Sequence, residues 1–217
     1  MRSKSLIAVS AAILALSALP AFANQSNAAR ELSKEERASL ANGALVQRPL
    51  TQRRGSLDLM GGTSYQVIDA APEVVWRALL DTPRYARMMP QVLEAKVVRS
   101  KGAERTVFVR QGAGPVQKAY YLKVNVHEDQ KDITFSVDER RPHDLRAAWG
   151  FYNVRPYADG SKTLLAYGVM ADLGGGIVVA LVRDEVHSWM LKVPQTVKRF
   201  VEGRGKKLYQ SPVLARR

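Results

Sequence analysis

The spacing of apolar residues in this chain changes once along its length, and that change limits the folds the chain can adopt. Before about residue 172, several segments have alternating apolar and polar residues, as in 131–138, where Ile133, Phe135 and Val137 share one face. From Ile177 to about Glu202, apolar residues recur instead at intervals of three and four. Alternation is typical of half-buried strands, and the second spacing is typical of an amphipathic helix. We therefore expect an α+β domain in which one long C-terminal helix covers the apolar face of a sheet.

Seven segments have strand-like patterning, and the turn residues Lys101-Gly102 and Asp159-Gly160 indicate hairpins between neighbours. This order predicts one curved, seven-stranded antiparallel sheet wrapped around the C-terminal helix. Two short helices, 73–80 and 82–89, follow the first strand, because Pro72 suits a first helical turn and Pro90 ends the second helix. The expected strands are 63–70, 92–100, 104–111, 116–127, 131–138, 144–156 and 162–172.

Pro194 lies inside the predicted C-terminal helix, where it removes the backbone hydrogen bond to the carbonyl of Met190. We expect a kink at this position. Two interpretations stay open. The kink opens room beneath the helix, or it is a tolerated bend with no use.

The N-terminus has the three parts of a secretory signal peptide. Arg2 and Lys4 precede the apolar stretch from Leu6 to Leu19, and residues 21–23 read AFA, a small-residue cleavage site. Crossing a membrane takes roughly 20 apolar residues, so this stretch is too short for a membrane span. We expect residues 1–23 to be a signal peptide cleaved after Ala23, which predicts a periplasmic or secreted protein.

The rest of the chain divides into three parts. Residues 24–62 are expected to hold a short helix, 34–42, because Ser33 and Glu36 form a capping box, followed by a linker or irregular strand from Arg48 to Gly62. Residues 63–203 are expected to form the folded domain. Residues 204–217 are expected to be a basic, flexible tail.

The chain has 217 residues and a formal net charge of +13, and much of this charge flanks the predicted domain. A nucleic-acid-binding domain would carry a basic stripe on its folded body, so we expect no nucleic-acid partner. Basic flanks are attracted to anionic lipid head groups. The alternative is that they are solvated tails that aid solubility. The residues proposed for a membrane surface are Arg48, Arg53, Arg54, Lys206 and Lys207.

The composition excludes several kinds of site. The chain has no cysteine, which rules out disulfides, iron–sulfur clusters, zinc ribbons and a thiol nucleophile. His127, His143 and His187 lie far apart and have no metal-ligand spacing. No phosphate-binding or dinucleotide-binding motif is present in the sequence. We therefore expect no metal and no cofactor.

Three motifs in order resemble the START-like superfamily, also called SRPBCC. Residues 67–76 (VIDAAPEVVW) resemble the opening strand, turn and helix of that superfamily, and 81–90 (DTPRYARMMP) resemble its second helix. Residues 150–163 (GFYNVRPYADGSKT) resemble its late hairpin. The resemblance covers roughly residues 63–203 and implies the helix-grip fold. The superfamily includes polyketide cyclase/dehydrase relatives, lipid-transfer domains and coenzyme Q-binding proteins.

Family members hold an apolar ligand between the sheet and the long helix, so the resemblance implies a cavity of that kind here. Apolar and aromatic residues line most ligand pockets. For each residue taken alone, plain core packing is the alternative. The candidate ligand-binding residues are Tyr85, Met88, Met89, Tyr120, Phe135, Trp149, Phe151, Trp189, Met190 and Val193.

Three functions remain open at this point. The first is an exported protein that binds a lipid, a quinone or another hydrophobic small molecule. The second is a cavity enzyme of the polyketide cyclase/dehydrase type, for which His143, Asp144, Arg146 and His187 are polar residues to consider but no catalytic residue can be assigned. The third is a ligand-free protein that interacts with another protein of the cell envelope.

Overall fold

The computed structural model describes residues 32–89, 91–113, 116–175 and 177–210. The chain divides into two compact units, Met1–Leu32 and Ser33–Arg217, and every element named below belongs to the second. The predicted signal peptide lies outside the described residues. Within the described part, no helix is long and apolar enough to cross a membrane.

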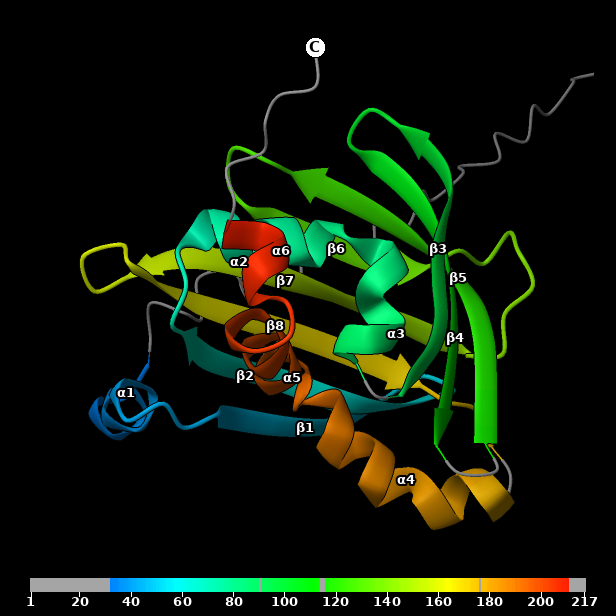
Figure 1. The fold of residues 1–217 in the computed structure, drawn as a ribbon. Helices are drawn as coiled ribbons and strands as arrows, with labels where there is room; N and C mark the ends of the chain where they lie inside the picture. Colours follow the sequence, from blue (N-terminus) through cyan, green and yellow to red (C-terminus); the bar gives the residue numbers. More distant parts are fainter. Residues whose placement is uncertain (1–31, 90, 114–115, 176, 211–217) are drawn as a thin grey trace, which may run out of the picture. The chain divides into compact units, whose positions relative to one another are not determined.

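The α+β class is confirmed, and the sheet is antiparallel, but it has eight strands instead of seven (Figure 1). Their order is β1-β2-β8-β7-β6-β5-β4-β3, so only the β2–β8 contact joins strands far apart in the chain. The strands are β1 Val46–Arg54, β2 Leu57–Ile68, β3 Val92–Lys101, β4 Glu104–Ala113, β5 Val116–His127, β6 Asp132–Val137, β7 Ala147–Tyr157 and β8 Lys162–Asp172.

The segment from Arg48 to Gly62, expected to be a linker or irregular strand, forms most of β1 and the first half of β2 instead. Residues 46–54 pair with 57–65 in unbroken antiparallel register, and Gly55 turns the chain between them with a φ of +59°. Pro49 cannot donate a ladder hydrogen bond, but β1 lies at the edge of the sheet, where that loss is tolerated. Most side chains of β1 are exposed, so its sequence has no alternation to reveal it.

The predicted helices before β3 are confirmed, with small shifts at their ends. α1, Lys34–Ala41, begins at the capping box: the Ser33 hydroxyl accepts from the Glu36 amide at 3.2 Å, and the Glu36 carboxylate accepts from the Ser33 amide at 2.8 Å. α2 spans Pro72–Leu80, with Pro72 in its first turn. The second predicted helix divides into a short 3₁₀ turn, η2 Thr82–Arg84, and α3, Tyr85–Met88.

The C-terminal helix is interrupted where one long kinked helix was predicted. α4 spans Ile177–Met190, and α5, Val193–Glu202, begins after a break with Pro194 in its first turn. Proline lacks a backbone N–H donor, and amides in the first turn of a helix have no acceptor within that helix. The break therefore places Pro194 where the missing donor costs least.

Residues 204–210 correct the prediction of a flexible tail. They include a further helix, α6 Lys206–Gln210, and the side chain of Tyr209 is only 6% exposed. The prediction rested on charge and overlooked this aromatic residue. The Tyr209 hydroxyl donates to the Asp81 carboxylate at 2.9 Å, and its ring lies 6.3 Å from that of Phe200.

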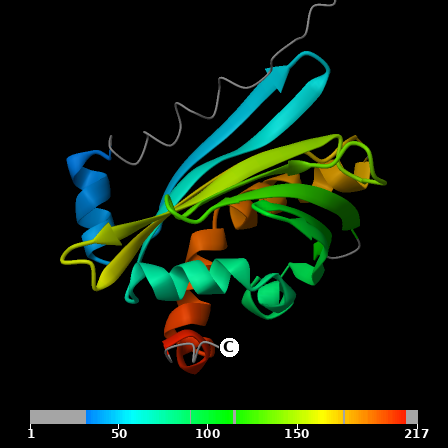
Figure 2. The same ribbon diagram turned by 90° about the horizontal axis from the view of Figure 1, so that it is seen from above.

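The helices α2, α3 and α5 lie on the same side of the curved sheet (Figures 1 and 2). The apolar side of α5 is buried, with Val197 fully enclosed and Phe200 and Val201 beside it. Trp76 of α2 belongs to the same core. α4 precedes α5 across the break, and residues of both helices line the cavity described next.

Candidate functional site

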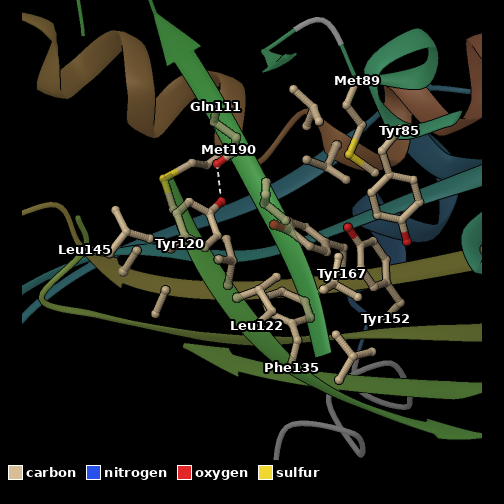
Figure 3. A pocket seen from close by; sticks show the side chains of 18 of the residues that line it. Tyr85, Met89, Gln111, Tyr120, Leu122, Phe135, Leu145, Tyr152, Tyr167 and Met190 are labelled. Carbon is tan, nitrogen blue, oxygen red and sulfur yellow. Dashed lines mark hydrogen bonds between the residues drawn. The ribbon is translucent and has the colours of Figure 1, made fainter. Parts of the chain in front are cut away.

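A cavity of about 150 Å³ lies between the sheet and the helices (Figure 3). Strands β3 to β8 line it on one side, and residues from α2, α3, α4 and α5 line it on the other. Nearly all of the lining is apolar or aromatic. A hollow of this composition is suited to a hydrophobic ligand.

Strand alternation explains which residues face the cavity. On β5 every second side chain from Lys118 to Val126 lines it. On the neighbouring β4 the same alternation applies, so that Val107 pairs with Leu122 and Val109 with Tyr120. The lining residues on these two strands are Arg105, Val107, Val109, Gln111, Gly112, Lys118, Tyr120, Leu122, Val124 and Val126.

Two glycines let aromatic rings approach the sheet closely. A side chain on Gly150 would collide with the ring of Phe135, which lines the cavity. A side chain on Gly168 would collide with the ring of Phe151. Gly168 falls between Tyr167 and Val169, which both face the cavity, so Phe151 covers the opposite face of the sheet.

Four tyrosines line the cavity: Tyr85, Tyr120, Tyr152 and Tyr167. Burial raises the pKa of each above its ordinary value, so all four are neutral at physiological pH. Figure 3 shows Tyr85, Tyr152 and Tyr167 grouped on one side, and Tyr120 beside Met190 on the other. The rings of Tyr152 and Tyr167 lie 4.8 Å apart.

The tyrosine hydroxyls differ in their hydrogen bonds. The Tyr85 hydroxyl donates to the backbone carbonyl of Leu79 at 2.5 Å, and the Tyr120 hydroxyl donates to the side-chain carbonyl of Gln111. For Tyr152 and Tyr167, no hydroxyl hydrogen bond is present within the described part of the chain. These two hydroxyls are therefore free to contact a ligand.

Few lining residues are charged. Arg105 and Lys118 carry positive charges, and the described lining contains no aspartate, glutamate or histidine. Trp189 lines the cavity as well, and its indole Nε1 is buried without a hydrogen-bond acceptor among the described residues. Buried donors in proteins are normally paired, so this one is a candidate contact for a ligand acceptor.

The structure brings seven of the ten candidate residues together around the cavity: Tyr85, Met89, Tyr120, Phe135, Trp189, Met190 and Val193. Met88 is buried in the core but does not line the cavity. Trp149 and Phe151 alternate with Ala148 and Tyr152, which do line it, so they project from the opposite face of β7.

Sequence reasoning missed two aromatic lining residues, Tyr152 and Tyr167, and the cation Arg105. β7 and β8 are apolar on both faces for much of their length, so periodicity alone cannot show which face is inward. Gly150 was a usable signal, since a glycine in a strand often marks close approach of another group.

The polar residues considered for catalysis lie elsewhere. The Nδ1 atom of His143 lies 2.6 Å from the carbonyl oxygen of Leu145, and the Nε2 atom of His187 lies 2.7 Å from that of Gly61. Both imidazoles are therefore engaged with backbone. Asp144 accepts from the Ala119 amide at 2.8 Å, and Arg146 lies 3.4 Å from the Asp172 carboxylate. The described residues contain no cluster of three or more histidine or acidic side chains that could hold a metal ion.

The basic flanking residues have different surroundings. Arg48 donates to the Glu36 carboxylate at 2.6 Å and lies over the ring of Tyr65, so its charge is used within the domain. Arg53 lies 3.7 Å from Asp58 in an exposed pair. Arg54, Lys206 and Lys207 are exposed.

Comparison with known proteins gives one family. Residues 68–191 match the profile of the family described as polyketide cyclase / dehydrase and lipid transport. No curated protein matches the sequence significantly.

Solved structures share the fold at low sequence identity. TTHA0849 of Thermus thermophilus is 19% identical, with a TM-score of 0.58 over 69% of this chain and 98% of its own. The STAR-related lipid transfer protein of Xanthomonas axonopodis is 16% identical, with a TM-score of 0.54 over 72% of this chain and 99% of its own. The Zhui aromatase/cyclase of Streptomyces sp. R1128 is 13% identical, with a TM-score of 0.52 over 68% and 98%. These likenesses show the helix-grip fold, in which a curved antiparallel sheet wraps around C-terminal helices.

Proposed function

Because the chain belongs to the polyketide cyclase / dehydrase and lipid transport family, we propose that it is an exported protein that binds a hydrophobic small molecule, such as a lipid or a quinone, in the cavity between sheet and helices. The observation that carries this proposal is the cavity itself, which is lined mainly by aliphatic and aromatic side chains. Transfer of a ligand's apolar surface from water into such a site contributes about 25 cal/mol per Å².

The size of the cavity limits what it holds without rearrangement. An apolar cavity of about 150 Å³ is large enough for a benzene-sized group, whereas pockets for drug-sized ligands measure roughly 300–1,000 Å³. A single ring or a short alkyl chain therefore fits as the cavity stands. A longer ligand requires side chains to move, and Met89 and Met190 are suited to this because methionine is unbranched and adaptable.

Uncharged polar groups in the lining can orient a ligand through hydrogen bonds. The neutral hydroxyls of Tyr152 and Tyr167 and the unpaired Nε1 of Trp189 can each donate to a ligand oxygen. A carbonyl or hydroxyl group on an otherwise apolar ligand satisfies these donors.

The family also includes cyclases and dehydrases, so catalysis in the same cavity is the alternative. General acid–base catalysis is most effective when the pKa of the group lies near the working pH. Burial moves the pKa of the lining tyrosines away from that range. Their chemistry therefore favours hydrogen bonding to a ligand over proton transfer.

Export is part of the proposal and rests on the pattern of residues 1–23. Fractionation of bacterial cells that express the full chain is expected to place a shortened protein in the periplasm or medium, with Asn24 as its first residue. A full-length protein found in the cytoplasm would contradict export and leave the binding proposal unaffected.

Contact of Arg53, Arg54, Lys206 and Lys207 with anionic lipid would assist exchange of a ligand with a membrane.

Native mass spectrometry of the gently purified protein tests the binding proposal. We expect a mass above that of the bare chain, and an organic-solvent extract that contains a hydrophobic compound in matching amount. The variant Ala148→Leu fills part of the cavity and is expected to carry less of the compound, while Ala86→Leu, on an exposed position, serves as the control. A bare chain mass in every preparation would count against the proposal.

A further inference from the structure

Arg105 is an unusual residue for the wall of an apolar cavity. It projects from β4 in the same alternation as Val107 and Val109, and its side chain is half-buried. Two other half-buried arginines are paired with carboxylates: Arg84 with Asp81 at 2.7 Å, and Arg48 with Glu36 at 2.6 Å. Arg105 has neither an ion pair nor a side-chain hydrogen bond within the described residues. Partial burial of an unpaired charge is unfavourable, so an anion that reaches it is stabilised.

The surroundings of Arg105 are positive. Its charge acts on the buried Tyr85 hydroxyl, where it opposes the effect of burial on the pKa. Arg105 and Val124 also line a second, more polar hollow. The acidic residues of that hollow are Glu104 and Asp138, and Asp138 is already paired with Lys123 and Arg141. Its basic residues are Arg99, Lys101, Arg105, Lys123, Arg140 and Arg141.

We propose that the cavity ligand is an amphiphile with an anionic head, a carboxylate or phosphate, which pairs with Arg105 while its apolar tail occupies the cavity. This rests on the proposed function and narrows its ligand class. A guanidinium presents parallel donors that match the two oxygens of a carboxylate or phosphate. The cavity lining within the described residues offers no competing carboxylate, so an anionic head is not repelled there.

Lys118 is the natural comparison, because it is the second cation of the lining. It pairs in register with Gln111 near the opposite end of β4, on the side of the cavity where Tyr120 lies. A head group held by Arg105 therefore lies toward the other end of β4 from Lys118. Substitution of each cation in turn distinguishes the two ends.

Three ligands with the same eight-carbon chain test the proposal by calorimetric titration of the purified protein at pH 7. Octanoate carries a negative charge, 1-octanol no charge and octylamine a positive charge. We expect octanoate to bind about tenfold more tightly than 1-octanol, the magnitude of one charge-assisted hydrogen-bonded contact, and octylamine to bind most weakly. In Arg105→Gln, octanoate should bind about tenfold more weakly while 1-octanol binding stays within about twofold. Arg105→Lys should keep part of the preference, and Lys118→Gln all of it.

The outcomes separate this inference from the proposed function. Binding of 1-octanol that equals that of octanoate in the unmodified protein overturns the anionic-head assignment and leaves hydrophobic binding standing. A preference that persists in Arg105→Gln, or that disappears only in Lys118→Gln, overturns the role of Arg105. If none of the three ligands binds, the proposed function fails, and this inference fails with it. Thermal melting of each variant checks that its fold is retained.

Discussion

Gly150 shows how one missing side chain shapes the cavity. The ring of Phe135 lies where a Cβ atom on Gly150 would be, and the backbone carbonyl of Gly168 approaches from the neighbouring strand. The ring therefore lies close against the sheet and leaves space above it. Because the carbonyl belongs to the backbone of β8, it cannot move aside without disturbing the ladder between β7 and β8.

The substitution Gly150→Ala is expected to destabilise the fold by about 1–3 kcal/mol, since the added methyl group overpacks this contact. Urea denaturation of the variant measures the change in the free energy of unfolding. Gly175→Ala is the matched control, because a Cβ atom there meets no other atom within 4 Å. Equal stability of the two variants would contradict the close approach of Phe135.

Glu36 supplies a prediction about pH. The side-chain hydrogen bond from Arg48, followed by the backbone hydrogen bond from Ser33, lowers the pKa of Glu36 from 4.5 to about 2. A lowered pKa means that the ionised carboxylate stabilises the fold fully above pH 4.5, and that this contribution is lost as the pH falls toward 2.

The variant Glu36→Gln removes this charge while glutamine keeps the capping contact to the Ser33 amide. We expect it to be less stable than the unmodified protein by up to about 1 kcal/mol at pH 7, because the ion pair is partly exposed. Thermal melting from pH 7 to pH 2 should show this difference shrinking below pH 4.5. A difference that stays constant over that range would rule out the ion pair as its cause.

At the scale of elements, α6 shows what charge patterning misses. The basic composition of residues 204–217 predicts a solvated tail, but Tyr209 packs beside Phe200 and donates to Asp81. Arg77 of α2 donates to the backbone carbonyl of Tyr209 as well. The short helix is held by these tertiary contacts, which a scan of local composition cannot reveal.

We expect Tyr209→Ala to destabilise the domain by about 2 kcal/mol or more, since it removes a buried ring and a hydrogen bond. Leu208→Ala is the control in the same helix, because Leu208 is 47% exposed. Denaturant unfolding compares the two. Similar losses in both variants would show that the helix is not docked through Tyr209.

Local signals in the sequence explain several of the correct predictions. β6 alternates clearly, and α2 begins at a proline. β1 has no such pattern because its side chains are mostly exposed, and it was predicted as a linker or irregular strand. β7 and β8 were predicted as strands, but the sequence did not show which face of each strand lines the cavity. That face was identified only from the register of the strands in the structure.

For the whole molecule, the order of elements was enough to predict a sheet closed by C-terminal helices, because few arrangements bury one apolar sheet face. The cavity is a different matter. A cavity forms only where side chains from several distant segments leave a space between them unfilled. Protein interiors are normally close-packed, so such a space is not the default. Tyr152, Tyr167 and Arg105 enter the lining through the curvature and register of the sheet, which no single segment encodes.

The central claim is that this cavity binds an apolar ligand, and calorimetric titration with 1-octanol tests it most directly. We expect saturable binding to one site with a negative heat-capacity change, the mark of apolar burial. Ala148→Leu, which narrows the cavity, should weaken binding about tenfold or more, while the exposed variant Ala86→Leu should not change it. No saturable binding to the unmodified protein, or equal binding in the folded Ala148→Leu variant, would contradict the claim.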